Sequence, residues 1–192
     1  MLAALLVALA APAAAPRPTE RYDATFRKYS RRFFGPAWDW RLFKAQALTE
    51  SGLDSAAASR AGARGVMQLM PSTFAQIQSK NPEFHSVDHP ESNIAAGIYH
   101  ARALWRLWRG SVVTEDRTTF MFGSYNAGRV PILRAQALAA ARAFDPARWA
   151  SVEAVAPDVP RWRHRETLTY VRRIEGNLAR MDDRGRVVRR AR

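Results

Sequence analysis

The residue of this 192-residue chain best placed for chemistry is Glu50, a carboxylate near the end of a predicted helix. In the run 41–50, Phe43, Ala47 and Glu50 are spaced by four and three residues, so they share one helical face, which is otherwise apolar. Gly52 stands where a helix end favours a left-handed residue, which puts Glu50 in the last turn. Apolar surroundings and the negative end of the helix dipole both disfavour an ionised carboxyl. We therefore expect a raised pKa for Glu50, as a general acid requires; a solvated surface glutamate is the alternative.

Several short strings near and after Glu50 occur in the order and spacing of a known family. Glu50-Ser51-Gly52 is followed by Ser59–Gly62 and by Gly-Val-Met-Gln-Leu-Met-Pro at 65–71. Further strings are Asn-Ile-Ala-Ala-Gly at 93–97, Ser-Tyr-Asn-Ala-Gly at 124–128 and Tyr-Val at 170–171. Together they resemble the catalytic domain of soluble-type lytic transglycosylases, which is related to goose-type lysozyme. The resemblance covers roughly residues 22–180, and the occurrence of several such strings in the family's order makes it specific.

This resemblance implies an all-α fold: a single lysozyme-like helical domain with a substrate groove. It also implies a reaction, cleavage of the β-1,4 bond between N-acetylmuramic acid and N-acetylglucosamine in peptidoglycan. Glu50 would act first as acid and then as base, giving a 1,6-anhydro product without a cofactor. Two alternatives stay open, a lysozyme-type glycoside hydrolase on the same fold and a non-catalytic peptidoglycan-binding module.

The matching strings also imply roles for other residues. Tyr125 resembles the family's tyrosine that hydrogen-bonds and orients the catalytic glutamate, and Tyr170 matches one that closes the pocket. The remaining expected contacts to substrate come from small hydroxyls, a turn residue and the walls of the groove: Ser51, Ser59, Asn126, Met67 and Gln68. For Met67 and Tyr170, a place in the hydrophobic core is the alternative.

Apolar periodicity and breaker residues predict helices along most of the chain and no strand. Gly and Pro in 123–128 and 145–163 predict a turn and a loop with short turns. The expected helices cover 22–34, 38–50, 71–78, 91–109, 114–122, 130–144 and 166–181.

The N-terminus is typical of an exported protein. Residues 1–15 combine an apolar run with Ala-Pro-Ala, which indicates a signal peptide, although no Lys or Arg precedes the run and a disordered Ala-rich segment is the alternative. We expect a linker at 16–21, the domain at 22–181 and a mobile basic tail at 182–192. The chain has no cysteine, which excludes disulfides and a lipid-modified cysteine anchor, and its four histidines lack the spacing of a metal motif.

A formal charge of +13 favours a polyanionic partner. No nucleic-acid-binding motif accompanies the arginines, so we interpret the charge as attraction to an anionic cell wall; a general preference for Arg is the alternative. We expect a monomer in the periplasm or outside the cell, acting on glycan strands, without a stable membrane anchor. It would be either a housekeeping enzyme or part of a secretion or conjugation machine.

Overall fold

Helices account for the secondary structure of residues 18–188, the part of the chain that the computed structural model describes. Within this part the extended backbone is limited to isolated bridges, such as those of Arg64 with Ala58 and Leu69. The expected all-α class is confirmed. The elements are η1 (Pro18–Glu20), α1 (Asp23–Phe34), α2 (Arg41–Glu50), α3 (Pro71–Gln78), α4 (Pro90–Leu107), α5 (Arg117–Ala127), α6 (Arg129–Ala141), α7 (Trp149–Val155), η2 (Ala156–Asp158) and α8 (His164–Leu178).

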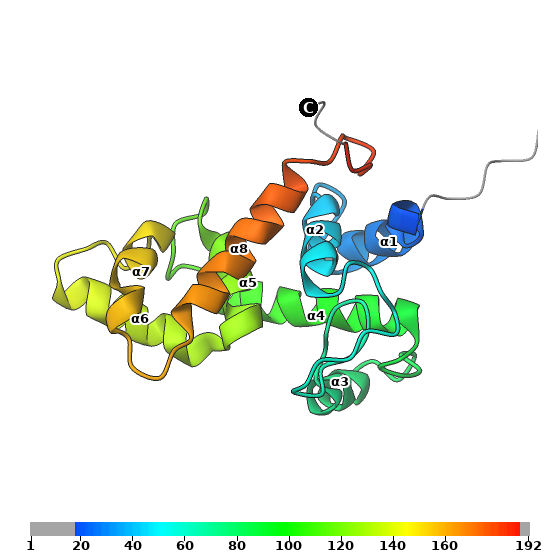
Figure 1. Cartoon of the computed structure of the whole chain (residues 1–192), viewed down its shortest axis with the longest axis horizontal. Coiled ribbons are helices and arrows are strands. Elements are labelled where there is room, and N and C mark those ends of the chain that lie inside the picture. Colours follow the sequence, from blue (N-terminus) through cyan, green and yellow to red (C-terminus); the bar gives the residue numbers. More distant parts are fainter. Residues whose placement is uncertain (1–17, 189–192) are drawn as a thin grey trace, which may run out of the picture.

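Helix α4 runs through the middle of the molecule, with α1 and α3 toward one end and α6 and α7 at the other (Figure 1). Its central residues are buried almost without exception, as expected of a helix that is covered by α1, α3 and α5. Helix α8 crosses α5 and packs along α2, the helix that carries Glu50. The N-terminal and C-terminal parts of the sequence therefore meet at the end of α2.

The predicted turn at 123–128 is wrong, because α5 continues through it to Ala127. Gly123 does not break the helix; it makes room for a neighbour, since a Cβ there would lie 2.4 Å from the ring of Trp149. Ser124 is buried and accepts a hydrogen bond of 3.0 Å from the indole of Trp108. Tyr125 and Asn126 thus lie in the last turn of a helix, and only Gly128, at φ +77°, ends it.

The predicted loop at 145–163 is also partly wrong, because it contains α7 and η2. Trp149 begins α7, and its backbone amide donates to the Asp116 carboxylate at 2.8 Å. The breaker residues Pro146, Pro157 and Pro160 lie outside α7, so they limit the helix without preventing it.

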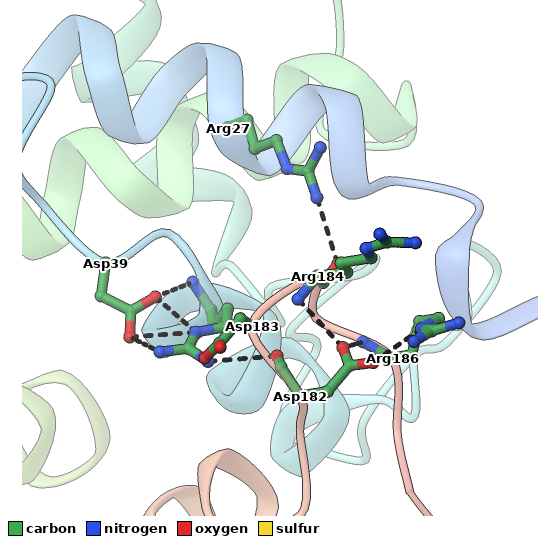
Figure 2. Close-up of polar contacts among 7 residues, drawn as sticks. Arg27, Asp39, Asp182, Asp183, Arg184 and Arg186 are labelled. Atoms are coloured by element: carbon green, nitrogen blue, oxygen red, sulfur yellow. Dashed lines mark hydrogen bonds and ion pairs between the residues drawn. The ribbon is translucent and has the colours of Figure 1, made fainter.

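Residues 182–188, predicted as the start of a mobile tail, fold back onto α1 and α2. Figure 2 shows Asp182 accepting hydrogen bonds from Arg184 and Arg186, and Arg27 of α1 donating to the backbone of Arg184. Arg41, the first residue of α2, donates to the carbonyl of Asp182 at 3.1 Å. We call residues 182–188 the C-terminal clasp. Residues 189–192 and the predicted signal peptide lie outside the described residues, and η1 occupies the described part of the predicted linker.

Lys44 connects the clasp to the core. Its side chain is fully buried, and its ammonium group donates to the carbonyl of Gly185 at 2.7 Å and pairs with Asp23 at 2.6 Å. A buried ammonium is costly unless it is neutralised and hydrogen-bonded, and these two partners meet that need. The clasp is therefore part of the folded domain.

No helix among residues 18–188 is both long and apolar enough to cross a membrane.

Candidate active site

Glu50 is the last residue of α2, as the sequence predicted. The chain leaves the helix through Gly52 at φ +67° and Leu53 at φ +69°, a left-handed exit that Gly52 adopts without steric cost. Ser51 donates a hydrogen bond of 2.9 Å to the carbonyl of Val66, which fixes the helix end against the returning loop. Glu50 is therefore held at a rigid junction between α2 and the 51–70 loop.

Burial dominates the electrostatics of Glu50 and raises the pKa of its carboxyl from 4.5 to about 7. Three groups act in the opposite direction and limit this rise: a hydrogen bond from Tyr170, the positive charge of Arg173 and an interaction with Gln46. The expected raised pKa agrees with this geometry. A carboxyl with a pKa near 7 is protonated in a large fraction of molecules at neutral pH and is also a competent base once it has lost its proton.

Tyr170 makes the direct contact with the acid. Its hydroxyl donates to Oε1 of Glu50 at 2.6 Å, and its ring is buried between α8 and α2. Gln46, one helical turn before Glu50, donates from Nε2 to the hydroxyl oxygen of Tyr170 at 3.0 Å. Because this oxygen accepts a hydrogen bond from Gln46, the hydroxyl hydrogen is directed toward Glu50. The two hydrogen bonds thus form a chain that runs from Gln46 through Tyr170 to Glu50, with each group donating to the next.

Gln46 was not among the site residues predicted from the sequence. The signal was available, because position 46 precedes Glu50 by four residues and shares its helical face. A fully buried amide on such a face needs a polar partner, and position 170 provides it from the far end of the chain.

The orienting role expected of Tyr125 is not what its contacts show. Its hydroxyl donates to the carbonyl of Met67 at 2.9 Å and makes no described hydrogen bond to Glu50. The ring is close enough for the charge of Glu50 to raise the pKa of the Tyr125 phenol beyond the effect of burial. His100 packs against this ring with 5.2 Å between centroids, and its own burial lowers the pKa of the imidazole. Tyr125 therefore joins α5 to the loop beside the acid.

Met67 does not line a groove with its side chain, which is 0% exposed. It packs so tightly on α4 that a Cβ at Gly97 would lie 2.7 Å from it. The core alternative is thus correct for the side chain of Met67, while its backbone carbonyl holds Tyr125. Gln68, at φ +44°, donates from Nε2 to the carbonyls of Gly65 and Ala57. Its amide nitrogen is therefore engaged in shaping the loop.

Asn93 of α4 holds the 51–70 loop in place by hydrogen bonds. Its Oδ1 accepts from the amide of Met67 at 2.8 Å, and its Nδ2 donates to the carbonyls of Arg64 and Val87 at 2.9 and 2.8 Å. Gly65 approaches this side chain closely, since a Cβ there would lie 2.6 Å from the Asn93 amide. Asn93 and Gly97, which carried part of the family resemblance, therefore support the loop from α4.

The other predicted contact residues differ in exposure. Ser59 is exposed, and its hydroxyl accepts from the amide of Ala63 at 3.0 Å. Asn126 is exposed at the end of α5 and borders two hollows of about 380 and 260 Å³ along the first turns of α8. Tyr170 lines the larger of the two. Asp54, which was not among the predicted contact residues, caps a turn four residues after Glu50 by accepting from the amide of Ala56 at 2.8 Å.

Among residues 18–188, no group of three or more His, Cys, Asp or Glu side chains could hold a metal ion.

The site has one half-buried carboxyl with a raised pKa, two tyrosines and a loop fixed by Asn93. Two solved structures are similar to this helical domain, and they support the assignment of its fold to the lysozyme-like class. One is the 70 kDa soluble lytic transglycosylase SLT70 from Escherichia coli, with 22% identity and a TM-score of 0.63 over 81% of this chain and 23% of that chain. The other is the complex of a 70 kDa soluble lytic transglycosylase with bulgecin A, at 23% identity and a TM-score of 0.63 over 82% of this chain and 23% of that chain.

Residues 34–147 match the sequence profile of the Transglycosylase SLT domain, and the chain belongs to this family. Among similar curated proteins is the membrane-bound lytic murein transglycosylase F of Shewanella pealeana, 29% identical over 78% of this chain and 29% of the relative. The protein of the same name from Vibrio cholerae is 31% identical over 69% of this chain and 23% of the relative. The chain thus spans less than a third of the length of these relatives.

Proposed function

We propose that this protein is a peptidoglycan lytic transglycosylase that cleaves the β-1,4 bond between N-acetylmuramic acid and N-acetylglucosamine. The observation that carries the proposal is the half-buried carboxyl of Glu50, whose pKa is raised to about 7 and which Tyr170 holds by a 2.6 Å hydrogen bond. The family membership and the names of the relatives support the same substrate and reaction.

Glu50 begins the reaction in its protonated form. It donates its proton to the oxygen that links the two sugars, so that this bond breaks as positive charge develops at C1 of the muramic acid. The carboxylate that remains is stabilised by the Tyr170 hydroxyl and by the charge of Arg173. It then removes the proton from the C6 hydroxyl of the same sugar, whose oxygen closes on C1 to give the 1,6-anhydro ring.

One carboxyl suffices for this sequence because the substrate supplies its own nucleophile, and the attack is intramolecular. Among the described residues near Glu50, Asp54 is the nearest carboxylate along the chain, and it is engaged in its turn. This favours the transglycosylase reaction over a hydrolysis that uses a second carboxylate. In this scheme Ser59 and Asn126 are exposed polar residues that contact the sugars, Gln68 contacts them through its side-chain carbonyl oxygen, and Ser51 and Met67 act through the loop.

The test is product analysis on purified peptidoglycan with the wild type and Glu50→Gln. We expect 1,6-anhydro ends from the wild type, and a loss of activity on the order of 10²–10⁴-fold for Glu50→Gln, the usual contribution of general acid–base catalysis. Reducing ends from the wild type would instead identify a hydrolase. Equal wall clearing by both proteins would show that Glu50 is not the acid.

We also propose that the protein acts in the bacterial envelope, where its substrate lies. The formal charge of +13 suits an anionic wall. Its monomeric state and its association with a secretion or conjugation machine stay predictions.

A further inference from the structure

A hollow of about 700 Å³ lies on the side of α8 that faces the C-terminal clasp. Four segments of the chain build it: η1, the last turn of α2, the second half of α8 with the two residues that follow it, and the clasp. Its lining residues are Thr19, Leu48, Arg173, Gly176, Asn177, Ala179, Arg180 and Val187.

The lining has one sign of charge. Arg173 and Arg180 contribute two guanidinium groups, and the lining contains no Asp or Glu. Among residues 18–188, Arg173 forms no ion pair, and the only acceptor of the Arg180 guanidinium is the side chain of Asn177, which is neutral. Leu48 and Val187 add apolar surface beside these charges. Such a lining suits an anionic ligand with a hydrocarbon body.

Arg173 connects this hollow to the site of Glu50. It also lines the neighbouring hollow of about 380 Å³, together with Tyr170, whose hydroxyl holds Glu50. The charge of Arg173 lowers the pKa of Glu50, so the two groups lie within electrostatic range. The only carboxylate in the lining of the smaller hollow, Glu166, is paired with Arg163 at 3.0 Å. A ligand bound near Glu50 could therefore extend past Arg173 into the larger hollow.

The wall formed by the clasp is held in a fixed position. Asp182 binds the amides of Arg184 and Arg186, and Arg27 holds the backbone of Arg184 (Figure 2). The amide of Val188 donates to the carbonyl of Arg180 at 2.8 Å, which ties the clasp to the end of α8. The hollow is thus preformed, which lowers the entropic cost of binding.

We propose that this basic hollow, defined by Arg173 and Arg180, binds the carboxylates of the peptide that branches from the glycan strand. This inference rests on the proposed function, since it assigns part of the peptidoglycan substrate to a second site beside Glu50. Guanidinium groups bind carboxylates with two parallel hydrogen bonds, and the apolar wall accommodates aliphatic peptide side chains. An uncharged sugar oligomer has no group that matches the two arginines.

Binding is measured with the Glu50→Gln variant, which keeps the hollow intact and does not depend on turnover. The probes are N-acetylmuramyl-L-alanyl-D-glutamate, which carries carboxylates, and tetra-N-acetylchitotetraose, which carries none. We expect the muramyl peptide to shift the amide NMR signals of Gly176 and Asn177 and chitotetraose to leave them unchanged. The peptide shifts should weaken with added salt, because exposed charges are screened.

Two variants and one matched control test the arginines. In the Glu50→Gln background, Arg173→Gln and Arg180→Gln should each weaken binding of the muramyl peptide, by roughly tenfold to a hundredfold for a lost charge-assisted hydrogen bond. The control is Arg172→Gln, which removes the same charge from the next position on α8, where Arg172 is paired with Glu153 at 3.3 Å outside the hollow. Its affinity should stay within twofold of the background, about the size of an exposed ion-pair effect.

Three outcomes would overturn the proposal: equal losses for Arg172→Gln and Arg180→Gln, peptide shifts confined to residues away from the hollow, or equal affinity for inorganic phosphate, which would reduce the hollow to a general anion site. The proposed function fails separately, if the wild type releases no anhydro ends. Because the binding experiment uses no catalytic step, either result can be read without the other.

Discussion

At the scale of single residues, the function of the two tyrosines near Glu50 is decided by the partner of each hydroxyl. The Tyr170 hydroxyl donates to the acid, whereas the Tyr125 hydroxyl donates to the carbonyl of Met67. A hydrogen bond to the ionised form of a carboxyl stabilises that form and lowers its pKa, so the two tyrosines should differ in their effect on Glu50.

Tyr170→Phe should therefore raise the pKa of Glu50 above 7, because the lost hydrogen bond favoured the carboxylate. In the proposed reaction the first step needs the protonated acid, so kcat/KM should fall as the pH rises through this pKa, and in Tyr170→Phe the fall should move to higher pH. The measurement is kcat/KM from pH 5 to 9, with a ¹³C NMR titration of the Glu50 carboxyl.

The matched variant is Tyr125→Phe. This variant removes a phenol hydroxyl that is bound to the Met67 carbonyl and keeps the hydrogen bond from Tyr170 to Glu50. The pKa of Glu50 should therefore not rise as it does in Tyr170→Phe. An upward movement in Tyr125→Phe, with none in Tyr170→Phe, would return the orienting role to Tyr125.

Three residues show how much of the site could be predicted from the sequence: Glu50, Gln46 and Met67. The position of Glu50 and its raised pKa follow from local spacing, because burial on one helical face is a property of a few neighbouring residues. The partner of Gln46 is not local, since Tyr170 lies 124 residues later. Met67 also depends on tertiary packing. Its motif predicted a side chain that lines the groove, but this side chain is buried against Gly97.

At the scale of elements, the 51–70 loop depends on one buried side chain of α4. Asn93→Ala should lower the free energy of unfolding by about 3 kcal/mol, because it leaves the Met67 amide and the Val87 carbonyl without this partner, whereas the Arg64 carbonyl keeps the amide of Leu69. Urea unfolding measures this loss. Asn126→Ala, an exposed asparagine at the end of α5, is the control and should change stability by at most about 0.5 kcal/mol. Comparable losses in both variants would show that the loop does not depend on Asn93.

The C-terminal clasp makes a similar prediction at Gly185. This residue has φ +80°, and a Cβ there would lie 2.2 Å from the ring of Trp40. Its carbonyl also accepts the hydrogen bond from the buried Lys44. Gly185→Ala therefore combines backbone strain with a steric clash, and we expect a loss of about 2–4 kcal/mol in the free energy of unfolding.

Gly110→Ala separates the two contributions. Gly110 has a similar φ of +79°, but a Cβ there would meet no atom within 4 Å. It should cost only the strain, about 1 kcal/mol. Thermal unfolding of both variants gives the difference, and equal losses would indicate that Trp40 moves aside and that the clasp is loosely packed.

Helix boundaries followed from the sequence where a local signal ends the helix. Pro71 begins α3 and Gly35 follows the end of α1, as local breakers predict. Gly123 was misinterpreted because a glycine can either break a helix or admit a bulky neighbour, and only the position of Trp149 decides between them. The clasp was missed for a related reason. A basic segment is typical of a solvated tail, but here Lys44, Arg41 and Trp40 provide partners from α2 and the turn before it.

At the scale of the whole molecule, the domain folds around Glu50, a carboxylic acid whose burial lowers the stability of the folded state. The order of the helices brings α2 and α8 together, so Glu50 is buried beside Tyr170. Burial favours the protonated carboxyl, while the unfolded chain leaves it in water at its ordinary pKa. The folded state therefore binds more protons than the unfolded state between the two pKa values, and its stability falls as the pH rises through this range.

Glu50→Gln should consequently stabilise the protein, and more so at pH 8 than at pH 4.5. The pKa of Glu50 is raised from 4.5 to about 7, and each pKa unit is worth about 1.4 kcal/mol, so the gain should grow by up to about 3 kcal/mol over this range. Gln is isosteric with the protonated acid, so the two proteins should be nearly equal at low pH. Urea unfolding at a series of pH values measures the difference.

The control of opposite sign is Glu91→Gln. Lys28 and Tyr29 donate hydrogen bonds to Glu91 and lower its pKa, so its contribution to stability is present above pH 4.5 and is lost as the pH falls. Removing its charge should destabilise the protein at neutral pH, and this effect should shrink in acid. If Glu50→Gln gave no gain at high pH while Glu91→Gln behaved as expected, the carboxyl of Glu50 would be solvated in solution. The acid–base role proposed for it would then lose its physical basis, because a solvated glutamate is ionised at neutral pH and has no proton to donate.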